Sequence, residues 1–73
     1  MDNRKQDIAY FLSFCIEQYK VKHALSGYDT MQLFARYGVL DYLANHFDIL
    51  HTQGHHWILE EIEDFINKRK QEL

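Results

Sequence analysis

The 73-residue chain has no proline, a single cysteine, and no apolar run near the ~18 residues needed to span a bilayer. Because Cys15 has no second cysteine to pair with, an internal disulfide framework like that of small secreted domains is excluded. Asp2, Arg4, Lys5 and Asp7 stand where a secretory signal would have its apolar core, so we expect no signal peptide. These absences predict a cytoplasmic protein without a membrane segment.

Basic residues are missing from a long central segment, since no Lys or Arg occurs from Tyr37 to Asn67. The same segment holds six acidic residues: Asp41, Asp48, Glu60, Glu61, Glu63 and Asp64. The formal net charge of −3 would not draw the whole protein to nucleic acid or to anionic lipid. The acidic segment is either a solvated helix face or a surface that docks on a basic partner.

The N-terminal stretch, residues 3–24, is predicted to be a helix with two apolar faces. The larger face has the i, i+3, i+4 spacing of a core-facing helix and consists of Ile8, Phe11, Leu12, Cys15, Ile16 and Tyr19. Tyr10, Phe14 and Val21 cluster on roughly the opposite side. A peripheral helix should be polar there, so either this helix is sandwiched inside the fold or its second stripe meets another chain.

Two further helices are expected on either side of Gly38. The first starts at Ser26, which has near capping-box spacing to Asp29, and ends at Gly38, a position suited to a left-handed residue. Its apolar face is predicted to contain Met31, Phe34, Leu33 and Tyr37. The second covers residues 39–47. Its buried stripe is predicted to be Leu40, Leu43, Ala44 and Phe47, with Val39 and Tyr42 off the stripe.

The C-terminal part is predicted to be an irregular connection followed by a helix. In residues 48–54, Ile49 and Leu50 are expected to tuck under the fold, and Gly54 marks a turn. The helix over residues 55–70 has a broad core face of Ile58, Leu59, Ile62, Phe65 and Ile66. Residues 1–73 are therefore predicted to be a single all-α domain, a compact bundle or orthogonal array of about four helices.

Metal binding and catalysis find little support in the sequence. Four histidines crowd one region, His46, His51, His55 and His56, but Gly54 interrupts the helix that would place His51 and His55 on one face. Cys15 lies on the apolar stripe and is expected to be a buried residue rather than a reactive thiolate. We therefore expect no metal, no cofactor, no catalytic residue and no small-molecule substrate.

Residues 30–49 weakly imitate a helix-turn-helix, which makes a DNA-binding transcriptional regulator the alternative function. The recognition helix would follow Gly38. Its polar residues are Asp41, Asn45, His46 and Asp48, with no Lys or Arg to contact phosphate or guanine. Binding to nucleic acid is therefore not favoured.

Several aromatic residues are not accommodated by the predicted core stripes, and Tyr and Trp are preferred anchors of protein interfaces. The candidate interaction residues are Tyr10, Phe14, Val21, Tyr42 and Trp57. The favoured function is a non-enzymatic protein–protein interaction module that binds another protein or itself as a homodimer. Alternatively, these rings cap the protein's own small core.

Four segments resemble a family of short bacterial proteins known only as a domain of unknown function. They are LSG at 25–27, LFARYGVLDYL at 33–43, LHTQG at 50–54 and ILEEIEDFI at 58–66. The resemblance covers nearly the whole chain and implies a small helical protein. It also implies an antitoxin-like or accessory partner of a neighbouring enzyme with an ADP-ribosyltransferase-like fold, and it assigns no catalytic residues. Within LHTQG, we expect Leu50 to anchor the connection, His51 to bond a backbone carbonyl and Thr52 to cap a helix end.

Overall fold

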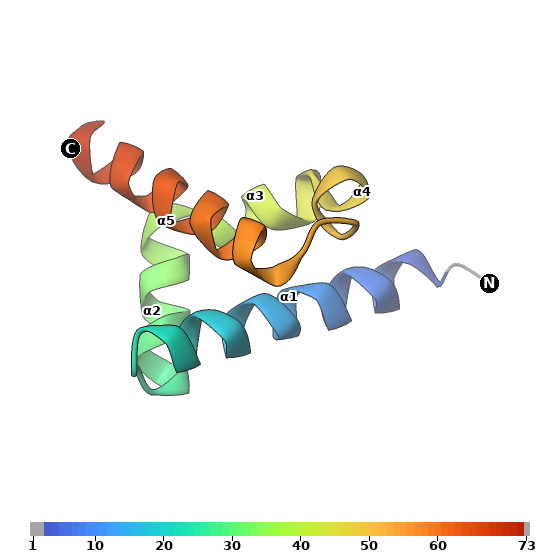
Figure 1. The fold of residues 1–73 in the computed structure, drawn as a ribbon, viewed down its shortest axis with the longest axis horizontal. Helices are drawn as coiled ribbons and strands as arrows, with labels where there is room; N and C mark the ends of the chain where they lie inside the picture. Colours follow the sequence, from blue (N-terminus) through green and yellow to red (C-terminus); the bar gives the residue numbers. More distant parts are fainter. Residues whose placement is uncertain (1–2, 73) are drawn as a thin grey trace.

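A computed structural model describes residues 3–72, which form five helices and no strand. In chain order these are α1 (Arg4–Lys22), α2 (Gly27–Tyr37), α3 (Val39–Asn45), α4 (Phe47–Leu50) and α5 (His55–Glu72). The two long helices, α1 and α5, lie one above the other, and α2 stands across the end of α1 (Figure 1). The all-α prediction is confirmed. None of the helices within residues 3–72 is both long enough and apolar enough to cross a membrane.

Local signals determine where α2 begins and ends. The Ser26 hydroxyl accepts a hydrogen bond from the Asp29 backbone N–H at 3.0 Å, which caps the first turn of α2. Gly38 has φ +69°, a left-handed conformation that ends α2 and lets α3 start in a new direction. Both signals were predicted from the sequence, and both are confirmed.

The prediction of one helix over residues 39–47 is wrong, because the backbone breaks at His46. His46 has φ −110° and ψ 21°, so α3 ends at Asn45 and a single further turn, α4, follows from Phe47 to Leu50. Two carbonyl groups of α4 form hydrogen bonds with side chains that follow the helix. His51 Nδ1 lies 2.6 Å from the Phe47 carbonyl oxygen, and the Thr52 hydroxyl donates to the Ile49 carbonyl at 2.9 Å. The predicted bonding roles of His51 and Thr52 are confirmed.

One hydrophobic core joins all five helices. Its buried side chains are Phe11, Cys15, Tyr19, Phe34, Tyr37, Val39, Leu43, Phe47, Leu50, Ile58, Leu59, Ile62 and Ile66. Thr30 is the buried polar residue of this core, and its hydroxyl donates to the Ser26 carbonyl at 2.9 Å. Because the core face of α1 packs against α2, α3 and α5, the position of α1 depends on all three.

For three side chains, the prediction of burial or exposure from the helical pattern is wrong. Val39 is fully buried, whereas Met31 and Ile49 are exposed. Val39 follows the turn at Gly38 directly, so its burial is set by the new direction of the chain rather than by the period of α3. In the one-turn helix α4, neighbouring residues point about 100° apart, and packing Leu50 inside therefore leaves Ile49 outside.

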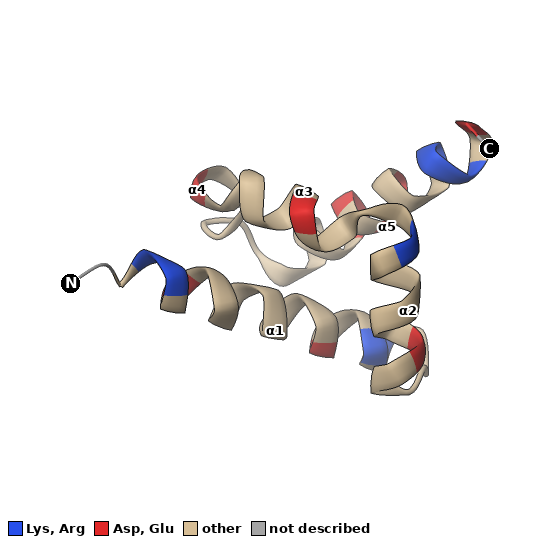
Figure 2. Ribbon diagram, turned by 180° about the vertical axis from the view of Figure 1, so that it is seen from behind, with Lys and Arg blue, Asp and Glu red and all other residues tan. Residues whose placement is uncertain are grey.

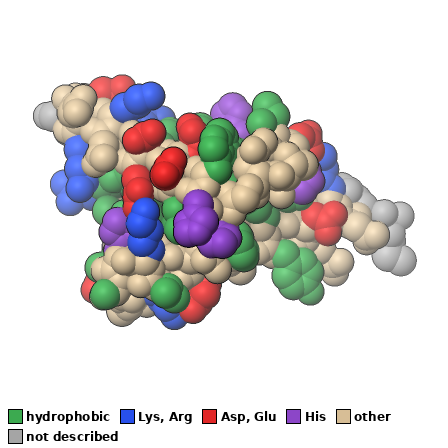
Figure 3. All heavy atoms as spheres, in the orientation of Figure 1, with side chains coloured by type: hydrophobic (Ala, Val, Ile, Leu, Met, Phe, Trp, Pro, Cys, Tyr) green, Lys and Arg blue, Asp and Glu red, His purple; other side chains and the backbone are tan. Residues whose placement is uncertain are grey.

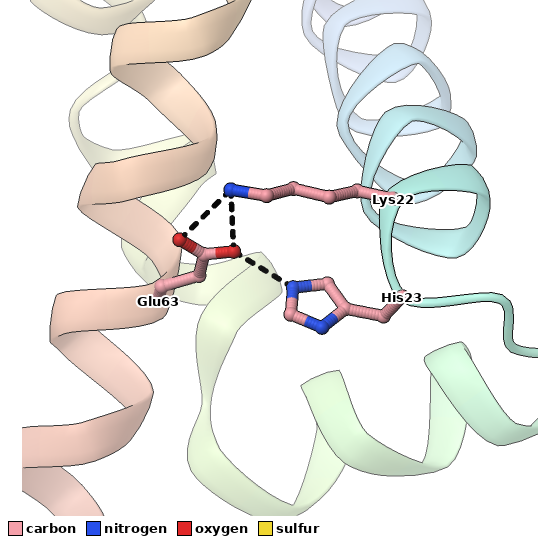
Figure 4. Close-up of polar contacts among 3 residues, drawn as sticks. All are labelled: Lys22, His23 and Glu63. Atoms are coloured by element: carbon pink, nitrogen blue, oxygen red, sulfur yellow. Dashed lines mark hydrogen bonds and ion pairs between the residues drawn. The ribbon is translucent and has the colours of Figure 1, made fainter.

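An ion-pair cluster ties the C-terminal end of α1 to α5 (Figure 4). Lys22 Nζ lies 2.9 Å and His23 Nε2 lies 2.7 Å from Glu63 Oε2. The His23 ring also stacks on Tyr19, with the centroids 4.1 Å apart. Partial burial raises the pKa of Glu63, but the hydrogen bonds and charges of Lys22 and His23 outweigh it, so the pKa lies below its usual value. The cluster fixes how α1 lies against α5.

Replacing Gly38 with Ala should lower the free energy of unfolding by about 1 kcal/mol, because a Cβ is unfavourable at this positive φ. No atom lies within 4 Å of the added Cβ, so the loss reflects backbone conformation rather than a clash. Gly27→Ala is the matched control, since it also has open space and has no positive φ. Urea unfolding measures both variants. Equal stability of the two would contradict a left-handed Gly38.

Replacing Glu63 with Gln should lower the free energy of unfolding at pH 7 by about 1 kcal/mol. The folded-state pKa of Glu63 is lower than its unfolded-state pKa, so its contribution to stability is fully present above the unfolded-state pKa and fades as the pH falls through the folded-state pKa. The difference between wild type and variant should therefore shrink at pH 3. Glu60→Gln, at an exposed position of α5, is the control. Equal effects of both substitutions at pH 7 would argue against the cluster.

Candidate protein-binding groove

The second apolar stripe of α1 is exposed to solvent. Tyr10, Phe14 and Val21 have exposed fractions of 77%, 42% and 69%. Hydrophobic side chains protrude from the lower edge of the molecule, where α1 lies (Figure 3). Of the two arrangements expected for this helix, the sandwiched one is therefore wrong for the single chain. The other helices cover the core face of α1, and its second stripe remains exposed to solvent.

Tyr10 and Phe14 border a groove of about 480 Å³. From α1 the groove is lined by Asp7, Tyr10, Phe11 and Phe14. From the segment that includes α4 and the start of α5 it is lined by Phe47, His51, Gln53 and Ile58. The N-terminal half of α1 runs below this segment, so residues far apart in sequence form the two walls (Figure 1).

Buried rings hold the two walls together. The rings of Phe11 and Phe47 meet edge to face, with centroids 5.6 Å apart. The His51 ring stacks on Phe47 at 4.3 Å. The Arg4 guanidinium lies over the Phe47 ring, with Cζ 5.8 Å from the ring centroid, and donates a hydrogen bond to Asp48 Oδ2 at 2.8 Å. This hydrogen bond holds the pKa of Asp48 below its usual value.

His51 has a defined hydrogen-bonding role in the groove. Its Nδ1 lies 2.6 Å from the Phe47 carbonyl oxygen, and a carbonyl oxygen can only accept. Nδ1 must therefore carry a proton, so Nε2 is the ring nitrogen left for a further hydrogen bond. A strong acceptor among the lining residues is the Asp7 carboxylate. The groove thus combines apolar walls with an acceptor group.

The remaining predicted interaction residues do not line the groove. Val21 lies about two turns beyond Phe14 on the same helix. Trp57 lies in the first turn of α5 and is exposed, with an exposed fraction of 44%. Tyr42 packs at the edge of the core and stacks on Phe65, with centroids 4.3 Å apart, as expected for a ring that caps the core. The structure brings together only Tyr10 and Phe14 of the predicted set.

The four clustered histidines are spread over different local contacts. His46 packs against Tyr42, His51 packs on Phe47, and His55 and His56 lie against each other. Within residues 3–72, no group of three His, Cys, Asp or Glu side chains is placed to hold a metal ion.

The sequence predicts cations in the last turn of the C-terminal helix, Lys68, Arg69 and Lys70, but not that Arg36 of another helix lies close to them. Arg36 and Arg69 line one hollow of about 340 Å³, and each guanidinium lies over an aromatic ring, Tyr37 and Phe65 respectively. Lys and Arg gather there at the ends of α2 and α5 (Figure 2). The available signal was that both arginines occupy the last turn of a helix. By contrast, α3 carries Asp41 and no Lys or Arg.

Residues 10–69 match a family described as "Protein of unknown function (DUF3791)". The chain belongs to this family, as its resemblance in four segments implied. No curated protein and no solved structure matches the chain.

Cys15 should not react with a thiol reagent in the native protein. Burial raises the pKa of the Cys15 thiol to about 12, so the nucleophilic thiolate is scarce at pH 8. We expect stopped-flow or absorbance measurements with an aromatic disulfide reagent to show slow labelling in buffer and rapid labelling in 8 M urea. Fast labelling of the folded protein would contradict the buried position of this side chain.

Proposed function

We propose that this member of the family is a non-enzymatic protein-binding module that docks on another protein through Tyr10, Phe14 and the groove beside them. One observation carries the proposal: two large aromatic side chains lie exposed at the border of an apolar groove. Single exposed apolar residues are common on protein surfaces, but a contiguous apolar patch marks an interaction site.

The protein's own fold does not require this stripe. The core face of α1 already contributes Phe11, Cys15 and Tyr19, which are buried. Tyr10 and Phe14 point away from that face, so packing of the single chain gives no reason for two aromatic rings there. Aromatic anchors beside a pocket are typical of residues that contribute most to binding energy.

The proposal also covers the cellular compartment and the biological role of this binding module. A lone, buried cysteine suits the reducing cytoplasm of a bacterial cell. A small domain with one binding face suits an accessory or antitoxin-like partner of an enzyme. DNA binding is less favoured, because α3 has no cation and the nearest basic cluster, Arg36 and Arg69, lies at the helix ends.

The double variant Tyr10→Ser with Phe14→Ser should stay folded and lose its partner. Because both side chains are substantially exposed, we expect the free energy of unfolding to fall by less than about 1 kcal/mol. Tagged wild type and variant are purified from the native cell, and bound proteins are identified by mass spectrometry. Light scattering gives the mass of each purified complex. Tyr28→Ser, at an exposed position of α2, is the matched control.

A stoichiometric partner retained by wild type and by Tyr28→Ser, but lost by the double variant, supports the proposal. Retention of that partner by the double variant would overturn the assignment of this surface. Unfolding of the double variant would show that the two rings belong to the core. A dimer of the wild type that becomes monomeric in the double variant would identify the partner as a second copy.

A further inference from the structure

We infer that the groove takes a polypeptide segment of another protein that presents a large apolar side chain close to a Lys or Arg. The inference rests on the proposed function, because it names the chemistry of what docks in the groove. Three properties of the lining residues carry it: their charge, their hydrogen-bonding groups and their spacing.

The charge of the groove is negative. Among its lining residues, Asp7 is the one carboxylate, and none is Lys or Arg. The segment that supplies the second wall lies within residues 37–67, which contain no Lys or Arg at all. Arg4 approaches Phe47, but its charge is matched by Asp48 at 2.8 Å. A cationic group on the partner would therefore be attracted to Asp7.

The strongest hydrogen-bonding group of the groove is an acceptor. The Asp7 carboxylate only accepts, whereas the Gln53 amide and the Tyr10 hydroxyl can both donate and accept. Lys and Arg side chains are pure donors, and charged hydrogen bonds are stronger than neutral ones. A purely apolar segment would give Asp7 no side-chain donor, and an acidic one would repel it.

The spacing along α1 sets the size of the recognised unit. Asp7 and Phe14 lie seven positions apart, or about 10 Å along the helix axis, with Tyr10 between them. The apolar side chain would enter between Tyr10, Phe14 and Ile58, and the cation would reach Asp7. A partner helix provides such a pair within about two turns, and an extended segment provides it within about three residues.

Two copies of this chain fit one another poorly when the same face of α1 meets itself. At about 100° per residue, the α1 face that bears Tyr10 and Phe14 also bears Asp7 and Glu17, but neither Lys nor Arg. Two copies of this face would bring like charges together. A separate basic segment has the complementary charge.

The test selects binders from a displayed library of random 16-residue peptides against the full-length protein. We expect enriched peptides to combine Lys or Arg with a large apolar residue. A synthetic copy of the most enriched peptide should bind Asp7→Lys about tenfold more weakly than it binds wild type. Its affinity for Asp7→Asn should lie between these two values. Asp41→Lys is the matched control, because Asp41 also lies in the first turn of a helix and does not line the groove. It should bind like wild type.

The outcomes separate this inference from the proposed function. Peptides without a basic preference, or equal effects of Asp7→Lys and Asp41→Lys, overturn the inference. The proposed function survives that result if the Tyr10→Ser and Phe14→Ser double variant still loses peptide binding. Peptides that bind the double variant as well as wild type, or a library that yields no binder, count against both. A wild-type dimer by light scattering, lost in the double variant, assigns the groove to a second copy and overturns the inference alone.

Discussion

The structure depends on one constraint: a 73-residue chain has a single core, and that core covers α1 on one side only. Phe34, Leu43 and Ile62 are fully buried residues of α2, α3 and α5, the helices that pack on α1. Within residues 3–72, no helix covers the opposite face of α1. The exposure of Tyr10 and Phe14 therefore follows from the packing of all the other helices on one side of α1. A helix with two apolar faces needs either a larger fold or a partner.

The groove depends on contacts at both ends of α1. Near the C-terminal end, Glu63 holds Lys22 and His23, and near the N-terminal end, Asp48 holds Arg4. Exposed ion pairs contribute only about 0–1 kcal/mol each to stability. The hydrophobic core, in which the rings of Phe11 and Phe47 meet, therefore provides most of the attraction that holds α1 against the other helices. The ion pairs add specific contacts at the two ends of α1.

Periodicity and capping signals in the sequence were enough to predict α1, α2, α5 and most of α3, but not α4 and only one wall of the groove. Ser26, Gly38 and the core face of α1 are local features, and the structure agrees with them. The break at His46, the burial of Val39 and the exposure of Ile49 follow from how short segments turn, which periodicity does not describe. Tyr10 and Phe14 were found because they share one helix. Phe47, His51, Gln53 and Ile58 were not, because tertiary packing brings them to α1.

The basic residues at the ends of α2 and α5 lie too far from the groove to change its electrostatic potential much. Arg36 and Arg69 lie in the last turns of α2 and α5, where cations stabilise the helix dipole, so helix stability explains their position. Ile58 of the groove and Arg69 are eleven residues apart on α5, or about 16 Å along its axis. That distance is about twice the ~8 Å Debye length at physiological ionic strength. The basic end is therefore largely screened from the Ile58 side of the groove, and under the proposed function a basic partner would be attracted to Asp7 rather than to that end.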